Sequence, residues 1–104
     1  MKIILVIILS VLQISSAKRV LNIYATDKQD KSYREQIRVL AADPIGMQER
    51  DLILKEHFGS IQFKITLIGK DGGEKYSTKS VLTLEKLYAL IDAMPMRKHE
   101  KSKK

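Results

Sequence analysis

The sequence predicts one small α/β domain whose elements follow the order β-α-β-β-β-α. Three patterns point to this class: an apolar run at residues 19–25, a stripe of helical spacing at 33–41, and apolar alternation at 63–69. The first strand, first helix and second strand form a parallel unit with a right-handed crossover. The last two strands form a hairpin. The expected sheet is therefore mixed and four-stranded, with helices packed on it.

The segment "RVLNIYA", residues 19–25, places apolar side chains on both faces, which predicts a central strand covered on both sides. A polar loop, "TDKQDK", follows at 26–31. We expect a helix from Ser32, a possible N-cap, to Asp43-Pro44, where the residue before proline avoids helical geometry. One face of this helix carries Tyr33, Ile37, Leu40 and Ala41.

Residues 44–50 read as a further short turn of helix, with Pro44 in its first position, although Gly46 weakens that assignment. The run Leu52, Ile53 and Leu54 predicts a short buried strand within 51–56. The next strand is expected at 63–69, where apolar and other side chains alternate with period two.

The stretch "KDGG", residues 70–73, predicts a hairpin turn in which glycine supplies positive φ. Residues 74–78 are polar except for Tyr76, as suits an edge strand. A last helix follows Thr83 and is stopped by Pro95, and its apolar stripe holds Leu84, Leu87, Tyr88 and Ile91. This order is the outline of a minimal thioredoxin-like fold.

Residues 1–17 have the features of a secretory signal peptide. Lys2 precedes an apolar run at 3–14, and small residues at 15–17 predict cleavage after Ala17. The alternative is a membrane anchor, but the apolar run is short against the roughly 20 residues that a span needs. We therefore expect a secreted or periplasmic protein with its domain at 18–96.

The net charge of +7 is unevenly distributed. Five basic residues and one acid give residues 97–104 a charge of +4, while thirteen basic and eleven acidic residues leave 18–96 with +2. We interpret 97–104 as a basic disordered tail. The alternative is adhesion to an anionic polymer or membrane surface, with Arg97, Lys98 and Lys101 as contacts.

The composition excludes thiol chemistry, because the chain of 104 residues has no cysteine. Its two histidines, His57 and His99, lack the spacing of metal ligands. The acids at 43, 49 and 51 are interpreted as turn residues rather than as a catalytic pair. We predict no catalytic residue, cofactor or metal, and no specific nucleic-acid binding, since basic residues do not interleave with aromatic ones on a sheet face.

Two segments, "LIGKDGGEKY" (67–76) and "LYALIDAMPMRKHE" (87–100), resemble a thioredoxin-like, peroxiredoxin-like family, the domain of unknown function 4174. The stretch "YREQIRVLAADPIGMQERDLIL" is similar as well. The family, part of the P-DUDES group, occurs in secreted bacterial proteins and in vertebrate matrix proteins. The resemblance implies a thioredoxin-like fold with envelope or matrix association.

This chain departs from the family between its second and third strands, where "HFGSIQ" replaces a longer segment that often holds a helix. The six residues can still cross one strand, because neighbouring strands lie about 4.8 Å apart. No proline precedes Phe63, where thioredoxins place the cis-proline that contacts bound peptides.

The functional hypothesis is a non-catalytic binding or structural module for an unknown protein or an envelope or matrix component. Candidate contacts are Thr26, Asp27 and Lys28 in the first loop and Tyr76 on the predicted edge strand. "AMPM", residues 93–96, is either a soft contact surface or a cover for the core. An enzyme with an unrecognised site is the third alternative.

Overall fold

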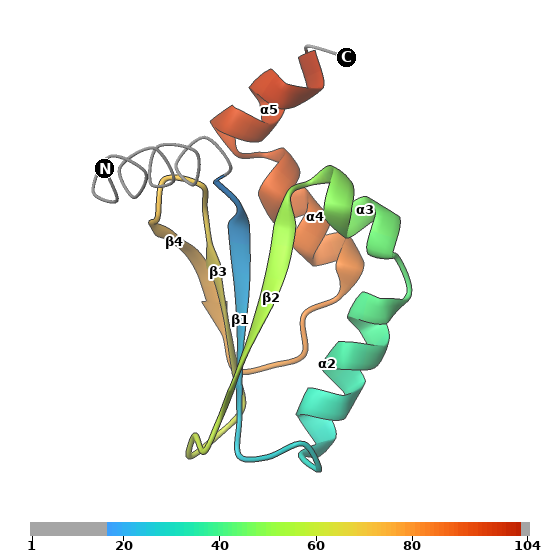
Figure 1. The fold of residues 1–104 in the computed structure, drawn as a ribbon, viewed down its shortest axis with the longest axis vertical. Helices are drawn as coiled ribbons and strands as arrows, with labels where there is room; N and C mark the ends of the chain where they lie inside the picture. The colour runs from blue at the N-terminus through green and yellow to red at the C-terminus, as the bar shows by residue number, and fades with distance from the viewer. Residues whose placement is uncertain (1–16, 103–104) are drawn as a thin grey trace, which may run out of the picture.

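The computed structural model describes residues 17–102, and the predicted signal peptide therefore lies outside it except for Ala17. Figure 1 shows the strands side by side with the helices arranged beside them. The elements are β1 (Arg19–Ala25), α2 (Lys31–Ala41), α3 (Pro44–Glu49), β2 (Leu52–Phe58), β3 (Lys64–Ile68), β4 (Glu74–Thr78), α4 (Leu84–Asp92) and α5 (Pro95–Ser102).

The sheet has the order β2-β1-β3-β4. Strand β1 pairs in parallel with β2 and antiparallel with β3, and β3 pairs antiparallel with β4. The short link after β2 carries the chain across β1 to its other side. The predicted mixed α/β class and four-stranded sheet are confirmed, and the arrangement is compatible with a small thioredoxin-like fold.

The core lies on one face of the sheet. Leu21 and Ile23 of β1 are fully buried there, whereas Val20 and Tyr24 on the other face are only half-buried. The expectation of a first strand covered on both sides was therefore wrong, because α2, α3 and α4 all lie on the same side (Figure 1). The buried cluster is Leu21, Ile23, Leu40, Met47, Leu52, Phe63, Ile65, Leu67, Leu82, Leu87 and Ile91.

The N-cap of helix α2 lies two residues earlier than expected. Asp30, not Ser32, is its N-cap, and the Asp30 carboxylate accepts a hydrogen bond from the Tyr33 N–H at 3.0 Å. Gln36 is buried and pairs with both backbone groups of Leu82, at 2.8 and 2.7 Å. This double hydrogen bond fixes the segment between β4 and α4 against α2.

The predicted short helix after Pro44 forms, and Asp43 caps it. The Asp43 carboxylate accepts from the Gly46 N–H at 3.0 Å. Glycine strengthens this helix, because a Cβ at position 46 would overlap the Asp43 carboxylate and lie 2.7 Å from the Tyr88 hydroxyl. Asp51 then turns the chain into β2 with φ of 53°, a left-handed conformation that aspartate tolerates better than most residues.

Strand β2 is longer and more exposed than the sequence predicts. It is an edge strand that extends to Phe58, and only Leu52 in it is buried. The expected buried run at 52–54 was wrong because a neighbouring strand covers one side of β2 alone. Ile53 lies on the uncovered face of the sheet.

The hairpin and α4 follow the expectations. Gly72 has φ of 85° in the turn, and the Thr83 hydroxyl caps α4 by accepting from the Lys86 N–H at 3.2 Å. After α4, Pro95 starts a new helix, so the expected disordered tail is helical through residue 102. Arg97 is buried within that helix, and residues 103–104 lie outside the description.

Candidate functional site

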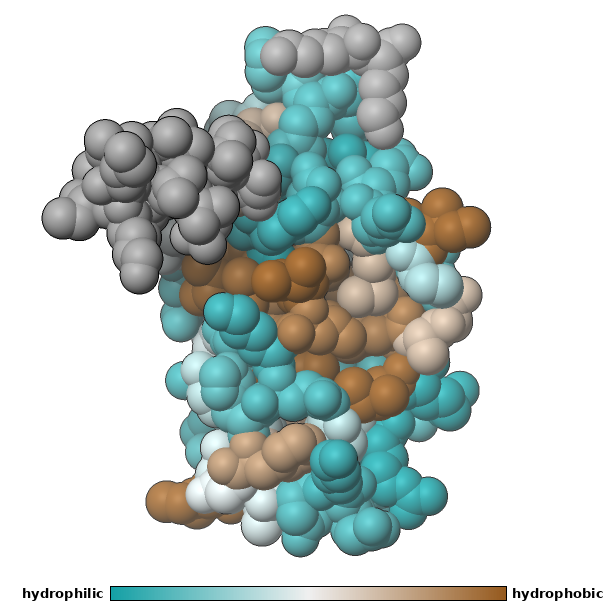
Figure 2. All heavy atoms as spheres, in the orientation of Figure 1, coloured by the Kyte–Doolittle hydropathy of each residue, from teal (hydrophilic) through white to brown (hydrophobic). Residues whose placement is uncertain are grey.

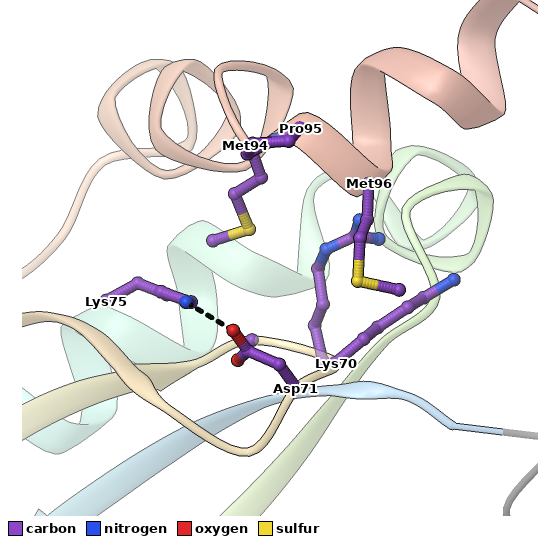
Figure 3. Close-up of a pocket in the computed structure, with 8 residues that line it drawn as sticks. Lys70, Asp71, Lys75, Met94, Pro95 and Met96 are labelled. Atoms are coloured by element: carbon purple, nitrogen blue, oxygen red, sulfur yellow. Dashed lines mark hydrogen bonds and ion pairs between the residues drawn. The ribbon is translucent and has the colours of Figure 1, made fainter.

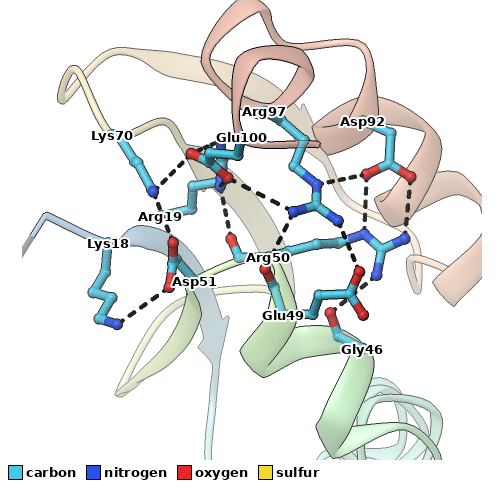
Figure 4. A network of polar contacts seen from close by, with 10 residues as sticks. All are labelled: Lys18, Arg19, Gly46, Glu49, Arg50, Asp51, Lys70, Asp92, Arg97 and Glu100. Carbon is cyan, nitrogen blue, oxygen red and sulfur yellow. Dashed lines mark hydrogen bonds and ion pairs between the residues drawn. The ribbon is translucent and has the colours of Figure 1, made fainter. Parts of the chain in front are cut away.

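A dense network of charges joins α5 to the start of the sheet (Figure 4). We call it the ion-pair network, and it contains two side chains that are almost fully buried, Arg19 and Arg97. A buried charge is stable only when it is paired and hydrogen-bonded. The residues of the network are Lys18, Arg19, Glu49, Arg50, Asp51, Lys70, Asp92, Arg97 and Glu100.

Asp92, at the end of α4, holds two arginines. Arg50 donates to both carboxylate oxygens of Asp92, at 3.2 and 3.1 Å, and its guanidinium stacks 3.7 Å from the Tyr88 ring centroid. Arg97 donates to Asp92 Oδ1 at 3.1 Å and to the side chain and carbonyl of Glu49, each at 3.2 Å. These contacts bind α5 to α3.

Glu100 organises the other half of the network. Both of its carboxylate oxygens accept from Arg19, at 3.3 and 3.2 Å, and Oε2 also accepts from Lys70 at 2.7 Å. Lys70 donates in addition to Asp51 at 2.8 Å. The β3–β4 turn, the start of β2 and α5 therefore meet at one lysine.

The pairing sets the charge states of these groups. The hydrogen bond from Lys70 lowers the pKa of Asp51 below its usual value. Burial alone would raise the pKa values of Asp92 and Glu100, but the hydrogen bonds from their cationic partners outweigh it, and both pKa values are lowered. The carboxylates thus remain ionised at neutral pH, which suits a structural clamp and offers no proton donor or acceptor poised near pH 7.

The β2 edge, unlike the ion-pair network, carries exposed apolar side chains. Among the exposed large apolar side chains of residues 17–102, Ile53 and Phe58 lie on β2, Ile45, at 75 % exposure, lies in α3, and the fully exposed Ile61 lies in the link between β2 and β3. The ring of Phe58 packs edge-on against Tyr33 of α2, with centroids 5.2 Å apart, and the Tyr33 hydroxyl donates to Glu56. These two contacts position the end of β2 beside the start of α2.

An apolar groove of about 300 Å³ lies between β2 and the helices α2 and α3. Figure 2 shows the apolar band that crosses this face of the molecule, with hydrophilic surfaces on either side of it. The groove is lined by Ile37, Leu40, Ala41, Pro44, Met47, Leu52 and Leu54. Sequence reasoning placed Ile37, Leu40 and Ala41 on one helix face and residues 52–54 in a buried strand, and nothing in that spacing reveals a groove between them.

The first predicted contact loop is held by its own hydrogen bonds. The Thr26 hydroxyl donates to the Ser60 carbonyl at 3.2 Å, and the Asp27 carboxylate accepts from the Gln29 N–H at 2.8 Å. The Lys28 ammonium lies 6.0 Å from the centroid of Phe58. All three residues are exposed, and the structure brings them to the same end of the sheet as the end of β2.

The other predicted contacts are separated by the fold. Tyr76 faces the core side of β4, opposite Leu67, with Lys86 of α4 5.4 Å from its ring centroid, so it is not a free edge residue. Arg97 is bound inside the ion-pair network and is not available to a polymer. Lys98 and Lys101 remain exposed on α5.

Within residues 17–102, no group of three or more metal-ligating side chains comes together. Over the same part of the chain, no helix has the length and apolar character needed to cross a membrane.

A family model described as a domain of unknown function (DUF4174) matches residues 54–100. These residues include both segments, 67–76 and 87–100, on which the resemblance to that family depends, and the ion-pair network joins the two in space. No curated protein and no solved structure matches the chain significantly.

Proposed function

We propose that this chain, whose residues 54–100 match the model of the domain of unknown function DUF4174, is a non-catalytic protein-binding module whose binding surface is the β2 edge with its apolar groove. The observation that carries the proposal is the apolar groove beside an edge strand that also exposes Ile53 and Phe58. Monomeric proteins rarely keep such a patch unless it binds something.

The β2 edge suits an extended peptide better than a globular surface. One side of β2 pairs with β1, which leaves a row of backbone N–H and C=O groups on the other side. A peptide that adds as a fifth strand satisfies those groups, and pockets beside the edge then select its side chains. The groove of about 300 Å³ lies where alternate side chains of such a strand would enter.

The occupant that fits is a partner segment with apolar residues facing the groove and acidic residues elsewhere. Arg34 and Arg38 of α2 are exposed, and helical geometry puts them beside the stripe of Ile37 and Ala41 that lines the groove. Pairing of β2 with a second copy of itself is less favourable. An antiparallel pair centred on Lys55, the middle residue of β2, would set two lysines opposite each other.

In this proposal the module acts outside the cytoplasm, as a secreted or periplasmic protein of the envelope or matrix. The pattern of residues 1–17 supports that location. Adhesion to an anionic polymer would depend on Lys98 and Lys101 of α5, because Arg97 is bound internally.

The proposal is tested by selecting ten-residue peptides from a random displayed library on the folded domain. We expect enriched peptides with alternating apolar residues and a net negative charge. In two-dimensional NMR spectra, their binding should shift the amides of residues 52–58 and leave those of 74–78 unchanged.

Matched variants of the two edges complete the test. Ile53→Lys should weaken peptide binding at least tenfold, whereas Ser77→Lys, the same side chain placed on β4, should leave it within twofold. Binding that maps to β4, a library without enriched peptides, or dimerisation through β2 in sedimentation would contradict the proposal.

A further inference from the structure

A second concave site, separate from the β2 groove, lies between the β3–β4 turn and the junction of α4 and α5. Its volume is about 290 Å³. Figure 3 shows Met94 and Met96 projecting from the helical side toward the turn that carries Lys70 and Asp71. The lining residues are Arg19, Gly69, Lys70, Asp71, Lys75, Met94, Pro95 and Met96, none of which lines the β2 groove.

Arg19 is the unusual member of this lining. Its side chain is fully buried, and its two terminal nitrogens are bound by Glu100 and by the Arg50 carbonyl, the latter at 2.7 Å. Its Nε, however, is buried without a hydrogen-bond partner. A buried donor without an acceptor costs about 1–3 kcal/mol, so such a group needs an explanation.

The charges around the pocket favour an anion. Three cations and a single carboxylate line it, and that carboxylate, Asp71, is bound by Lys75 at 2.8 Å (Figure 3). Glu100 and Asp51 pair with Arg19 and Lys70 but do not line the pocket. An incoming oxyanion therefore contacts more cationic than anionic side chains, although these two carboxylates offset part of the positive charge.

The remaining wall is apolar and adaptable. Met94, Pro95 and Met96 supply it, and the flexible thioether side chains of methionine adjust to ligands of different shape. One buried N–H donor beside such a wall matches a carboxylate on an aliphatic body. A phosphate would need several directed donors at once.

We propose that this pocket binds a small carboxylate with an apolar body, and that Arg19 Nε donates a hydrogen bond to its oxygen. The aliphatic part lies against Met94 and Met96. The ligand is either a free aliphatic acid or the C-terminal carboxylate of a peptide, two sources that share this chemistry. Binding here is independent of the β2 edge, because the two sites share no lining residue.

The test is an NMR titration of the domain with four compounds. Hexanoate should shift the Arg19 Nε–H signal and the methyl signals of Met94 and Met96 in a saturable manner. Hexanamide, the uncharged analogue, should bind at least tenfold more weakly, and inorganic phosphate should leave the methionine methyls unmoved. N-acetylleucine, a mimic of a peptide C-terminus, distinguishes the two sources: binding tighter than hexanoate indicates a chain end.

A variant that leaves the ion-pair network intact sharpens the result. Met96→Glu places a carboxylate at the half-exposed wall and should weaken hexanoate binding at least tenfold. Ser77→Glu adds the same charge on β4, outside the pocket, and should change binding less than twofold. Equal affinity for hexanoate and hexanamide, or the absence of a saturable shift up to about 10 mM, would overturn the proposal.

Discussion

The two edges of the sheet, β2 and β4, differ in how they meet solvent. Strand β4 presents polar side chains and turns its one aromatic residue, Tyr76, toward the core. Strand β2 leaves Ile53 exposed on the uncovered face of the sheet and Phe58 exposed at the strand end, and a groove opens along its other face. Natural sheets usually protect their edges with charge and polarity. The β4 edge obeys this rule throughout, whereas β2 combines the exposed charges of Lys55 and Glu56 with the exposed apolar Ile53 and Phe58, which is why we assign binding to β2.

The difference has a structural origin in how the helices are placed. Helix α4 packs behind β3 and β4, with Lys86 over the Tyr76 ring and Leu87 fully buried. On the other side, α2 and α3 meet β2 without closing over it, and the groove opens between them. Helix α4 therefore covers the middle of β4 at Tyr76, whereas the middle of β2 borders an open groove.

The largest expected effect is the loss of unfolding free energy when an apolar side chain beside each edge is shortened to alanine. Leu67→Ala, beside β4, removes a fully buried side chain and should lower the free energy of unfolding by about 2–5 kcal/mol. Leu54→Ala, at the half-buried wall of the groove, should cost roughly half as much, since less apolar surface is lost. Urea denaturation measures both, and equal losses would mean that the groove is closed in solution.

An intermediate effect is expected at the segment that connects β4 to α4. Gln36→Leu leaves both backbone groups of Leu82 without their partners and should destabilise the domain by about 1–3 kcal/mol. Gln48→Leu, on the exposed surface of α3, is the control and should change stability by less than about 0.5 kcal/mol. The melting temperatures of the two variants are compared by thermal unfolding. Similar values would mean that the Gln36–Leu82 hydrogen bonds do not stabilise the domain.

The smallest expected effect is a gradual loss of the free energy of unfolding in acid. This effect tests the ion-pair network, which connects the start of β2 to the β3–β4 turn through Lys70. The pKa values of Asp51, Asp92 and Glu100 are lowered from ordinary values of 3.8, 3.8 and 4.5. Their contribution is therefore complete above about pH 5 and is lost as the pH falls through the lowered pKa values. Partial exposure of these groups keeps the contribution modest.

Unfolding in urea at a series of pH values from 7 to 2 measures this loss, and hydrogen exchange locates it. Amides of α5 should lose protection in acid before those of β3. If α5 keeps its protection at pH 2, the ion pairs do not hold it.

Local patterns in the sequence determined most of the secondary structure. The alternation at 63–69, the glycine turn at 70–73 and the helix that follows Thr83 were predicted correctly, because each depends on residues within one element or turn. The absence of cysteine settled the exclusion of thiol chemistry in the same direct way.

Only the tertiary structure decided which charges and apolar residues are buried. Arg97 looked like part of a solvated tail, and its acceptors, Glu49 and Asp92, come from two other helices. Ile53 looked like core because its neighbours are apolar, yet strand order put it at an edge. Burial depends on which distant segments pack together, and the spacing of residues along a single chain does not contain that information.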